Sequence, residues 1–136
     1  MRHGRGIYYD QDRSIYDGEW YEDQRAGKGK ILFSDGSVYD GQWEADKIHG
    51  KGVYLSSNGD RYEGYFNLGM KEGFGAMYYR SGNTYQGQWK NDQLCGIGVF
   101  HFKNGNYYEG NFSNGNFEGQ GLMFFVGIGT YKGSFS

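Results

Sequence analysis

Apolar and polar residues alternate along most of this chain. In the segment Tyr39-Asp-Gly-Gln-Trp43, the two rings and the glycine fall on one side of an extended strand, and the aspartate and glutamine fall on the other. Alternation with a period of two favours β-strands over helices. A similar stretch, Gly27–Phe33, precedes it, and Ser34-Asp-Gly-Ser37 lies between the two. Because Asp-Gly is a strong signal for a tight turn, residues 27–43 are predicted to form a β-hairpin.

The same plan recurs every 23 residues, with a tyrosine, then a glycine two positions later, then a tryptophan or phenylalanine after two more. These repeat positions, which we interpret as structural, are Tyr16, Gly18, Trp20, Tyr39, Gly41, Trp43, Tyr62, Gly64, Phe66, Tyr85, Gly87, Trp89, Tyr108, Gly110 and Phe112. A looser copy follows at Tyr131, Gly133 and Phe135. The predicted fold is therefore all-β: an elongated, single-layer, twisted antiparallel meander of six hairpins that forms one array over residues 1–136. The hairpins are expected at residues 4–20, 27–43, 50–66, 73–89, 96–112 and 119–135.

The segments between hairpins, such as Tyr21–Ala26 and Glu44–His49, are polar, and we expect them to form six-residue loops. At the other edge of the sheet, the Asp-Gly and Asn-Gly pairs predict two-residue type I′ turns. A single-layer sheet has no second layer to cover it. Its rings are therefore expected to lie over the glycines of neighbouring hairpins and to shield the bare backbone.

Composition narrows the class of protein. The chain has 26 glycines, no proline and 20% aromatic residues, which excludes collagen and argues against disorder. A net charge of −2 does not favour nucleic acid as a partner. The lone Cys95 excludes an intrachain disulfide and fits a reducing compartment. Since the chain has no apolar run of about 18 residues and no apolar signal core, we expect a cytoplasmic protein.

Catalytic and metal-binding constellations are missing from the sequence. His3 and His49 share one repeat position before Gly-x-Gly, and Cys95 occupies the same position in a later repeat, so we interpret all three as side chains near a loop end. No Cys/His cluster has metal-ligand spacing. The Gly-x-Gly pairs are not followed by a helix that could hold a phosphate. The sequence therefore predicts a protein that is not an enzyme, with no cofactor and no metal.

The spacing Tyr-x-Gly-x-Trp, six residues, then Gly-x-Gly and a turn resembles the MORN repeat (membrane occupation and recognition nexus). Tyr39–Trp43 followed by His49-Gly-Lys-Gly52 matches this pattern, and so does Tyr85–Trp89 with Gly96-Ile-Gly98. The departures are Phe66, Phe112 and Phe135 in place of tryptophan, and Arg13 and Ile128 in place of the turn glycine. The resemblance implies a sheet with an aromatic groove that acts as a scaffold. It points to a structural component of a ciliary (axonemal, radial-spoke-like) or other cytoskeletal assembly.

Protein partners are expected along the groove or the sheet edges, at apolar residues that the repeat does not require. The candidates in the fourth repeat are Phe74, Met77 and Tyr78. In the last repeat the candidates are Leu122, Met123, Phe124, Phe125, Val126 and Ile128. That last hairpin is more hydrophobic than a terminal repeat usually is, which suggests that a second copy, a partner or further sequence covers it. A homo-oligomer or larger complex through the C-terminal end follows as a hypothesis.

The alternative is an adaptor that binds phosphoinositides or a membrane surface. Arg5, Lys28 and Lys51 share one repeat position, and Lys30 lies on the same side, so the first three hairpins would carry a basic row. Residues 1–68 nevertheless hold nine Lys/Arg and twelve Asp/Glu, a balance of 9 − 12 = −3, which opposes a general attraction to anionic lipid. A solvated face is the simpler interpretation of this row.

Overall fold

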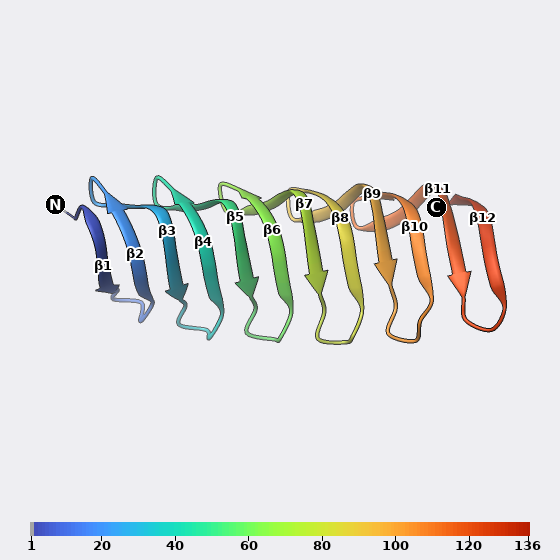
Figure 1. The fold of residues 1–136 in the computed structure, drawn as a ribbon, viewed down its shortest axis with the longest axis horizontal. Helices are drawn as coiled ribbons and strands as arrows, with labels where there is room; N and C mark the ends of the chain where they lie inside the picture. Colours follow the sequence, from blue (N-terminus) through green and yellow to red (C-terminus); the bar gives the residue numbers. More distant parts are fainter. Residues whose placement is uncertain (1) are drawn as a thin grey trace.

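The computed structural model describes residues 2–136 as one sheet of twelve strands. In chain order these are β1 Gly4–Tyr9, β2 Ile15–Tyr21, β3 Gln24–Leu32, β4 Val38–Glu44, β5 Lys47–Leu55, β6 Arg61–Asn67, β7 Met70–Tyr78, β8 Thr84–Lys90, β9 Gln93–His101, β10 Tyr107–Ser113, β11 Asn116–Phe125 and β12 Gly129–Phe135. Every strand pairs antiparallel with its neighbour in sequence, so the spatial order is the chain order. The two termini lie at opposite ends of a long array (Figure 1). The predicted meander of six hairpins is confirmed.

The lengths of the turns at the two edges of the sheet are the reverse of those expected. The segments predicted as six-residue loops are mostly strand, and only two residues form each turn. Glu22 and Asp23 connect β2 to β3 with φ values of 47° and 64°, and Ala45 and Asp46 repeat this geometry with 48° and 70°. Positive φ at both central residues is the signature of a type I′ turn. Polar residues at these turns concealed the strand ends on either side of them.

The Asp-Gly turns at the opposite edge are longer than predicted. Phe33 to Ser37 connect β3 to β4, and the N–H of Gly36 donates to the carbonyl of Phe33 at 3.0 Å. Only Gly36 has a positive φ there, 93°, so this is a type I turn followed by a left-handed glycine. Asp35 accepts hydrogen bonds from the backbone N–H and the hydroxyl of Ser37, at 2.8 and 2.6 Å. These bonds lower the pKa of the Asp35 carboxyl.

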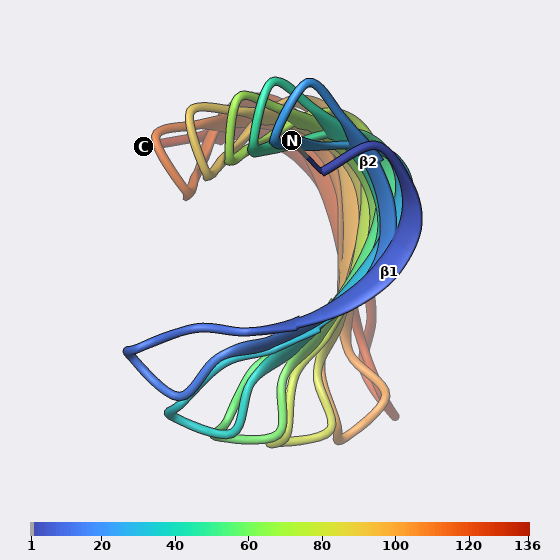
Figure 2. The ribbon, with the colours of Figure 1, turned by 90° about the vertical axis from the view of Figure 1, so that its left-hand side faces the viewer.

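The sheet is curved and has a C-shaped cross-section that is open on one side, as the view along the array shows (Figure 2). A register shift occurs where each even-numbered strand from β2 to β10 pairs with the next strand, for example between Gly18 and Trp20 and between Gly41 and Trp43. A bulge of this kind bends its strand and increases the local twist. Because the shift recurs at the same repeat position, the bends of successive strands line up along the array. Together they give the sheet one continuous concave side.

The core of this single layer is a column of rings. We call the side of the sheet that carries them the ring face. Its buried apolar residues are Tyr16, Trp20, Ile31, Tyr39, Trp43, Tyr62, Phe66, Met77, Tyr85, Trp89, Leu94, Tyr108 and Phe112. The first five repeat tyrosines are at most 2% exposed. The single layer therefore buries a column of rings without a second layer.

Candidate protein-binding groove

The repeat tyrosines lie flat on glycines of the next hairpin. A Cβ placed on Gly29 of β3 would be 2.1 to 2.5 Å from atoms of the Tyr16 ring, and one placed on Gly52 of β5 would be 2.3 to 2.6 Å from the Tyr39 ring. Such separations are far below van der Waals contact, so only glycine fits beneath each ring. This confirms in detail how rings can shield the bare backbone of a one-layer sheet.

Each tyrosine is also fixed at its hydroxyl. The hydroxyl of Tyr16 donates to the carbonyl of Glu19 at 2.8 Å, and that of Tyr39 donates to the carbonyl of Gln42 at 2.8 Å. Equivalent bonds hold Tyr62, Tyr85 and Tyr108. These carbonyls belong to the bulged segment, so the bonds stabilise the bend. Burial raises the pKa of Tyr16 to about 12, and burial also raises the pKa of the other four phenols.

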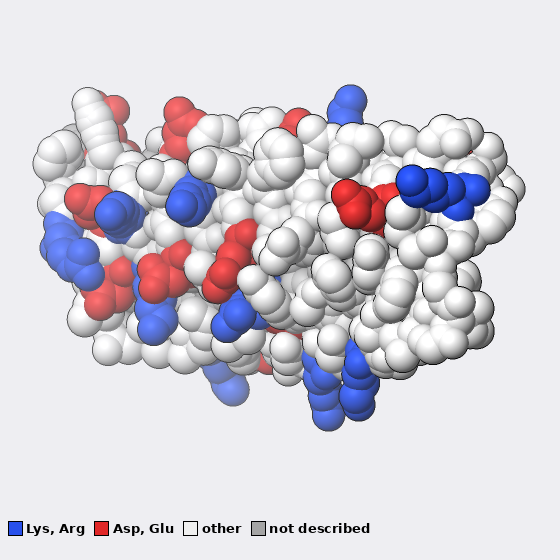
Figure 3. Space-filling view, turned by 45° about the vertical axis from the view of Figure 1, so that its right-hand side comes forward, with Lys and Arg blue, Asp and Glu red and all other residues white. Residues whose placement is uncertain are grey.

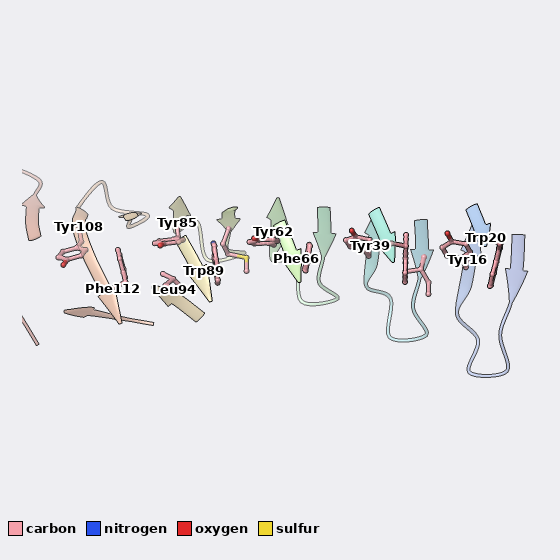
Figure 4. Close-up of a cluster of buried hydrophobic side chains, with 13 residues drawn as sticks. Tyr16, Trp20, Tyr39, Tyr62, Phe66, Tyr85, Trp89, Leu94, Tyr108 and Phe112 are labelled. Atoms are coloured by element: carbon pink, nitrogen blue, oxygen red, sulfur yellow. The ribbon is translucent and has the colours of Figure 1, made fainter. Parts of the chain in front are cut away.

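A tryptophan or phenylalanine closes over each tyrosine from two sides. Trp43 makes edge contacts with Tyr39 of its own strand and with Tyr16 of the preceding hairpin, at ring-centroid distances of 5.4 and 5.3 Å. Its indole N–H donates to the carbonyl of Gly29 at 2.9 Å. Figure 4 shows the pairs side by side along the array. The column therefore links every hairpin to the next, and edge-to-face ring contacts add to the burial.

Cations lie over the rings in the N-terminal half of the groove. Arg25 is 4.6 Å from the Trp43 ring centroid and forms a 2.8 Å ion pair with Asp46. Burial raises the pKa of the Asp46 carboxyl, but the hydrogen bonds from Arg25 outweigh this and the pKa is lowered. Lys71 lies 5.8 Å from the Trp89 ring and 3.8 Å from Asp92. Because these cations are paired with acids, they pack on the rings without giving the groove a strong net charge.

The ring face is hollowed at its N-terminal end. A cavity of about 210 Å³ there is lined by Tyr8, Tyr16, Trp20 and Ile31 from the strands. Asp10 and Ser14 border it from the turn at one edge of the sheet, and Asp23 and Asp46 border it from the turns at the other edge. Residues from both edges of the sheet and from the ring column line this one cavity, so the ring face is the concave side of the sheet. The ring face therefore forms the groove.

Toward the C-terminal end of the groove, apolar residues take the repeat position that Arg25 and Lys71 occupy in earlier hairpins. The positions equivalent to Arg25 and Lys71 are Leu94 and Phe117, 23 residues apart. Phe117 belongs to a cluster of half-buried rings, with centroid distances of 6.1 Å to Phe100 and 6.1 Å to Phe102. This row of positions was not recognised from the sequence. The signal that could have identified it was the 23-residue spacing of Arg2, Arg25, Ile48, Lys71, Leu94 and Phe117.

The three candidates of the fourth repeat do not form one surface. Phe74 is 63% exposed on the outer face, the side opposite the rings. Met77 pairs with Tyr85 and is only 9% exposed in the core. The prediction that its side chain contacts a partner is therefore wrong. Tyr78 is half-buried on the outer face, beneath the guanidinium of Arg61 at 4.5 Å. Of the three, Phe74 alone offers a large accessible apolar area.

The C-terminal candidates are also divided. Leu122 and Phe124 are half-buried on the outer face, where the Phe124 ring stacks on Tyr107 at 5.1 Å, while Met123 packs against the core on the ring face. Phe125, Val126 and Ile128 lie at the turn before β12 and are 38%, 53% and 87% exposed. The run therefore does not form the single patch expected from its sequence, and its accessible part is the turn.

The basic row of the alternative interpretation lies on the outer face among acids. Lys30 stands directly opposite Asp17 of β2 and Asp40 of β4. Arg5 is 3.6 Å from Asp17. Lys28 and Lys51 continue the row, opposite Gln42 and Tyr65. In Figure 3 positive and negative side chains are interspersed over the N-terminal hairpins, which gives a mixed surface instead of a positive one.

The histidines and the cysteine stay near the turns. His49 lies 3.2 Å from Glu44 and accepts a hydrogen bond from the N–H of Leu68 at 3.2 Å. Cys95 is a half-buried free thiol. Among residues 2–136, no group of three or more His, Cys, Asp and Glu side chains is placed to hold a metal ion. The same residues contain no helix that is long and apolar enough to cross a membrane.

A comparison with protein families identifies the repeat. A family model described as the MORN repeat matches residues 1–15, 16–38, 39–61, 62–84, 85–107 and 108–127. No curated protein matches the chain. Among solved structures, the chain is similar to the SAS-4 (dCPAP) TCP domain in complex with a proline-rich motif of Ana2 (dSTIL) of Drosophila melanogaster. The two share 12% sequence identity with a TM-score of 0.49, over 90% of this chain and 72% of that one.

Proposed function

The chain belongs to the MORN-repeat family, and on that premise we propose that it is a non-enzymatic scaffold that binds an extended segment of a partner protein along the groove. The observation that carries the proposal is the groove itself: a long concave surface whose rings are held by hydrogen bonds and by glycine beneath them. A surface that is already ordered loses little conformational entropy on binding. The residues that stay partly accessible in it, such as Tyr54, Phe100 and Arg25, are of kinds that interfaces favour.

The groove favours a partner segment rich in apolar side chains. Arg25 and Lys71 already pair with Asp46 and Asp92, so acidic groups of a partner would compete with existing ion pairs. The rings around Phe100 in the C-terminal half are only half-buried among the described residues, so their accessible edges can contact a partner. We therefore expect apolar contacts to supply most of the affinity, and the cations to contribute orientation.

A matched pair of variants tests the location of binding. Tyr54→Ser removes a half-buried ring from the groove, and Phe74→Ser removes a ring that is 63% exposed on the outer face. Both chains should be checked by thermal unfolding and then used to capture partners from cell extract, with quantification by mass spectrometry. Partners lost with Tyr54→Ser and retained with Phe74→Ser support groove binding. The opposite pattern would move the binding site to the outer face.

The cellular setting is a separate proposal. We place the scaffold in the cytoplasm, in association with the cytoskeleton, and specifically in a ciliary or flagellar axoneme, on the strength of the resemblance described above. Imaging of a tagged chain in ciliated cells, together with an axonemal marker, tests this setting. A diffuse signal that is lost on detergent extraction would contradict this cellular setting. It would leave the proposal of groove binding untouched.

The membrane-surface alternative has weaker support, since Asp17 and Asp40 flank Lys30 on the outer face. Sedimentation with liposomes that contain acidic phospholipid, at low and high salt, distinguishes the two functions. The scaffold proposal predicts little sedimentation at either salt concentration. Salt-sensitive sedimentation that is lost when Arg5, Lys28, Lys30 and Lys51 are reversed in charge would favour the adaptor.

Self-association through the C-terminal end completes the proposal. The feature of this end that supports it is the exposed turn of Phe125, Val126 and Ile128. Exposed apolar side chains that lie together are typical of protein–protein contacts. Sedimentation velocity of the wild-type chain and of the Phe125→Ser, Ile128→Ser double variant tests this contact, and the same mass for both chains would contradict it.

A further inference from the structure

A row of apolar side chains crosses the outer face of the first five strands. Tyr9, Ile15, Leu32, Val38 and Leu55 stand opposite one another on β1 to β5, and we call these five residues the apolar stripe. Tyr9, Leu32 and Leu55 are 71%, 42% and 44% exposed, and the other two are half-buried. Because Leu32 and Leu55 lie on interior strands, their exposure does not depend on what adjoins either end of the sheet.

The ring column does not require the apolar stripe. Each member of the stripe alternates along its strand with a residue that packs in or against the core, so it points away from the core. In the later hairpins the same row continues as Arg61, Tyr78, Thr84, His101, Tyr107 and Phe124. There the side chains cover one another, since Tyr78 lies beneath Arg61 at 4.5 Å and Tyr107 stacks on Phe124 at 5.1 Å. The aliphatic part of the row is left as contiguous exposed apolar surface, which is typical of a binding site.

Acidic residues border the apolar stripe on both sides. The next row of the outer face consists of Asp17, Lys30, Asp40, Val53 and Glu63, so it holds three acids and one lysine. On the other side, the turns at residues 10–14, 33–37 and 56–60 hold Asp10, Asp12, Asp35 and Asp60, and one arginine, Arg13. An apolar surface between two acidic borders is complementary to a basic amphipathic partner, and it repels a surface of anionic phospholipid.

The paired backbone around the stripe selects the conformation of the partner. Strands β2 to β5 each pair with a neighbour on both sides, so their main-chain groups are used within the sheet. An extended segment lying on this face would find no main-chain partners for its own N–H and C=O groups, whereas a helix satisfies these groups internally. The spacing also fits a helix. Neighbouring strands lie about 4.8 Å apart, and helical residues three and four apart are separated by about 4.5 and 6 Å along the axis.

From this row, its acidic borders and its paired backbone, we infer that the apolar stripe binds a basic amphipathic helix of a partner protein. The apolar side of the helix lies on the stripe, and its lysine or arginine side chains extend toward both borders. The helix crosses the strands and follows the long axis of the array in Figure 1. The five strands span about 19 Å, which corresponds to about 13 helical residues. Because the stripe and the groove lie on opposite faces, both sites can be occupied together.

The test uses the whole chain and two synthetic helical peptides of about 18 residues. Both peptides carry leucines three and four residues apart along one side. In the first peptide lysines flank the leucines, and in the second a glutamate replaces every lysine. Fluorescence anisotropy of the labelled peptides should show that the lysine peptide binds about tenfold or more tightly than the glutamate peptide. The difference should shrink at high salt, because the charges are exposed.

A double variant of the stripe tests the location of the site. Leu32→Ser combined with Leu55→Ser removes two exposed side chains, so the sheet should remain folded, which circular dichroism checks. Its affinity for the lysine peptide should fall about tenfold or more. Tyr54→Ser changes the ring face beside Leu55, and Phe74→Ser changes the outer face away from the stripe. Both controls should bind the lysine peptide as the wild-type chain does.

A second double variant tests the charge of the border. Asp17→Asn combined with Asp40→Asn keeps the size of both side chains and removes two acids. The affinity for the lysine peptide should fall about threefold or more, and the affinity for the glutamate peptide should not fall. If the leucine variant fails to fold, this charge variant decides the outcome.

Absence of binding by the lysine peptide at about 1 mM would overturn the inference, as would a preference for the glutamate peptide. Unchanged affinity in either double variant that folds would also overturn it. Loss of binding with Tyr54→Ser would move the helix to the groove. Vesicles of acidic phospholipid that sediment with the wild-type chain, but not with the leucine variant, would assign the stripe to a membrane surface and not to a helix.

Discussion

Tyr62 in the middle of the array and Tyr131 in its last strand begin the same motif, each with a glycine two residues later and a phenylalanine after two more. Tyr62 is 1% exposed and Tyr131 is 51% exposed. The difference comes from the next hairpin. Tyr62 lies on Gly75 and contacts Trp89 at 5.3 Å, and both residues belong to the hairpin that follows.

The comparison shows that the motif does not bury its own tyrosine. Within one hairpin the motif supplies the ring, the hydroxyl bond and one aromatic neighbour, and the following hairpin supplies the rest. The stability of the array therefore arises at the joints between hairpins, as expected for a repeat protein whose units contact only their neighbours. A single hairpin of this kind would be marginal in water.

High pH should break all the interior joints together. The phenol of a tyrosine has an ordinary pKa of 10.0, and burial raises that of Tyr16 to about 12 and also that of Tyr39 and Tyr62. A raised pKa in the folded state means that the stabilisation is complete below pH 10 and is lost as the pH rises toward and beyond 12. We expect cooperative unfolding in that window, with phenolate absorbance and loss of β-sheet circular dichroism rising together. Full ionisation of the tyrosines while the sheet remains folded would contradict the burial.

Truncation of the two tyrosines should reproduce the difference in their surroundings. Tyr62→Ala removes a ring that is fully enclosed, and should lower the free energy of unfolding by about 3–5 kcal/mol. Tyr131→Ala removes a half-exposed ring, and should cost about 1 kcal/mol or less when measured where the chain is monomeric. Denaturant titrations of both variants check this contrast. Equal costs would show that burial by the following hairpin contributes little.

Adding one methyl group beneath the rings should have a smaller but equally selective effect. Gly52→Ala would place a Cβ 2.3 to 2.6 Å from the Tyr39 ring, and the displaced ring should cost about 1–3 kcal/mol. Gly6→Ala meets nothing within 4 Å, and should leave the stability of the monomer unchanged or slightly higher because alanine restricts the unfolded chain. Thermal unfolding of dilute samples compares the two. A loss of stability with Gly6→Ala would mean that β1 is constrained in a way its surroundings do not show.

The smallest effect is expected from the hydroxyl alone. Tyr39→Phe keeps the ring over Gly52 but removes the 2.8 Å bond to the carbonyl of Gln42, which should cost about 1 kcal/mol. Because that carbonyl lies in the bulged segment, hydrogen exchange should accelerate around Gln42 more than elsewhere in β4. Unchanged exchange with a large loss of stability would indicate that the ring, and not the bend, had been disturbed.

The sequence was sufficient to predict the hairpins and the use of glycine beneath rings, because the spacing of tyrosine and glycine is invariant at 23 residues. The turns were predicted at the wrong length. Polar residues such as Glu22 and Asp23 do not show where a strand ends, since strands that extend into a polar edge have the same composition as loops. The curvature was also missed, because it depends on bulges at Gly18 and its equivalents that leave no separate signal in the alternation.

The candidate site was only partly predictable. Met77 was assigned to a free surface, although its alternation with Gly73 and Gly75 places it on the ring face. The cations over the rings were not recognised, because a lysine or arginine near a predicted loop is ordinarily solvated. Whether Arg25 packs on Trp43 or extends into water depends on the closeness of the next hairpin, and this is a property of the folded array.

The central claim, that each tyrosine and the glycine of the next hairpin act as one unit, is tested most directly by a double-mutant cycle on Tyr108 and Gly121. A Cβ on Gly121 would lie 2.5 to 2.6 Å from the Tyr108 ring, and this joint holds the last hairpin, so its loss leaves the others folded. Hydrogen exchange in β12 measures the free energy of opening. Gly121→Ala should cost about 1–3 kcal/mol in the wild-type chain and less than about 0.5 kcal/mol in Tyr108→Ala. The same cost in both backgrounds would contradict the claim.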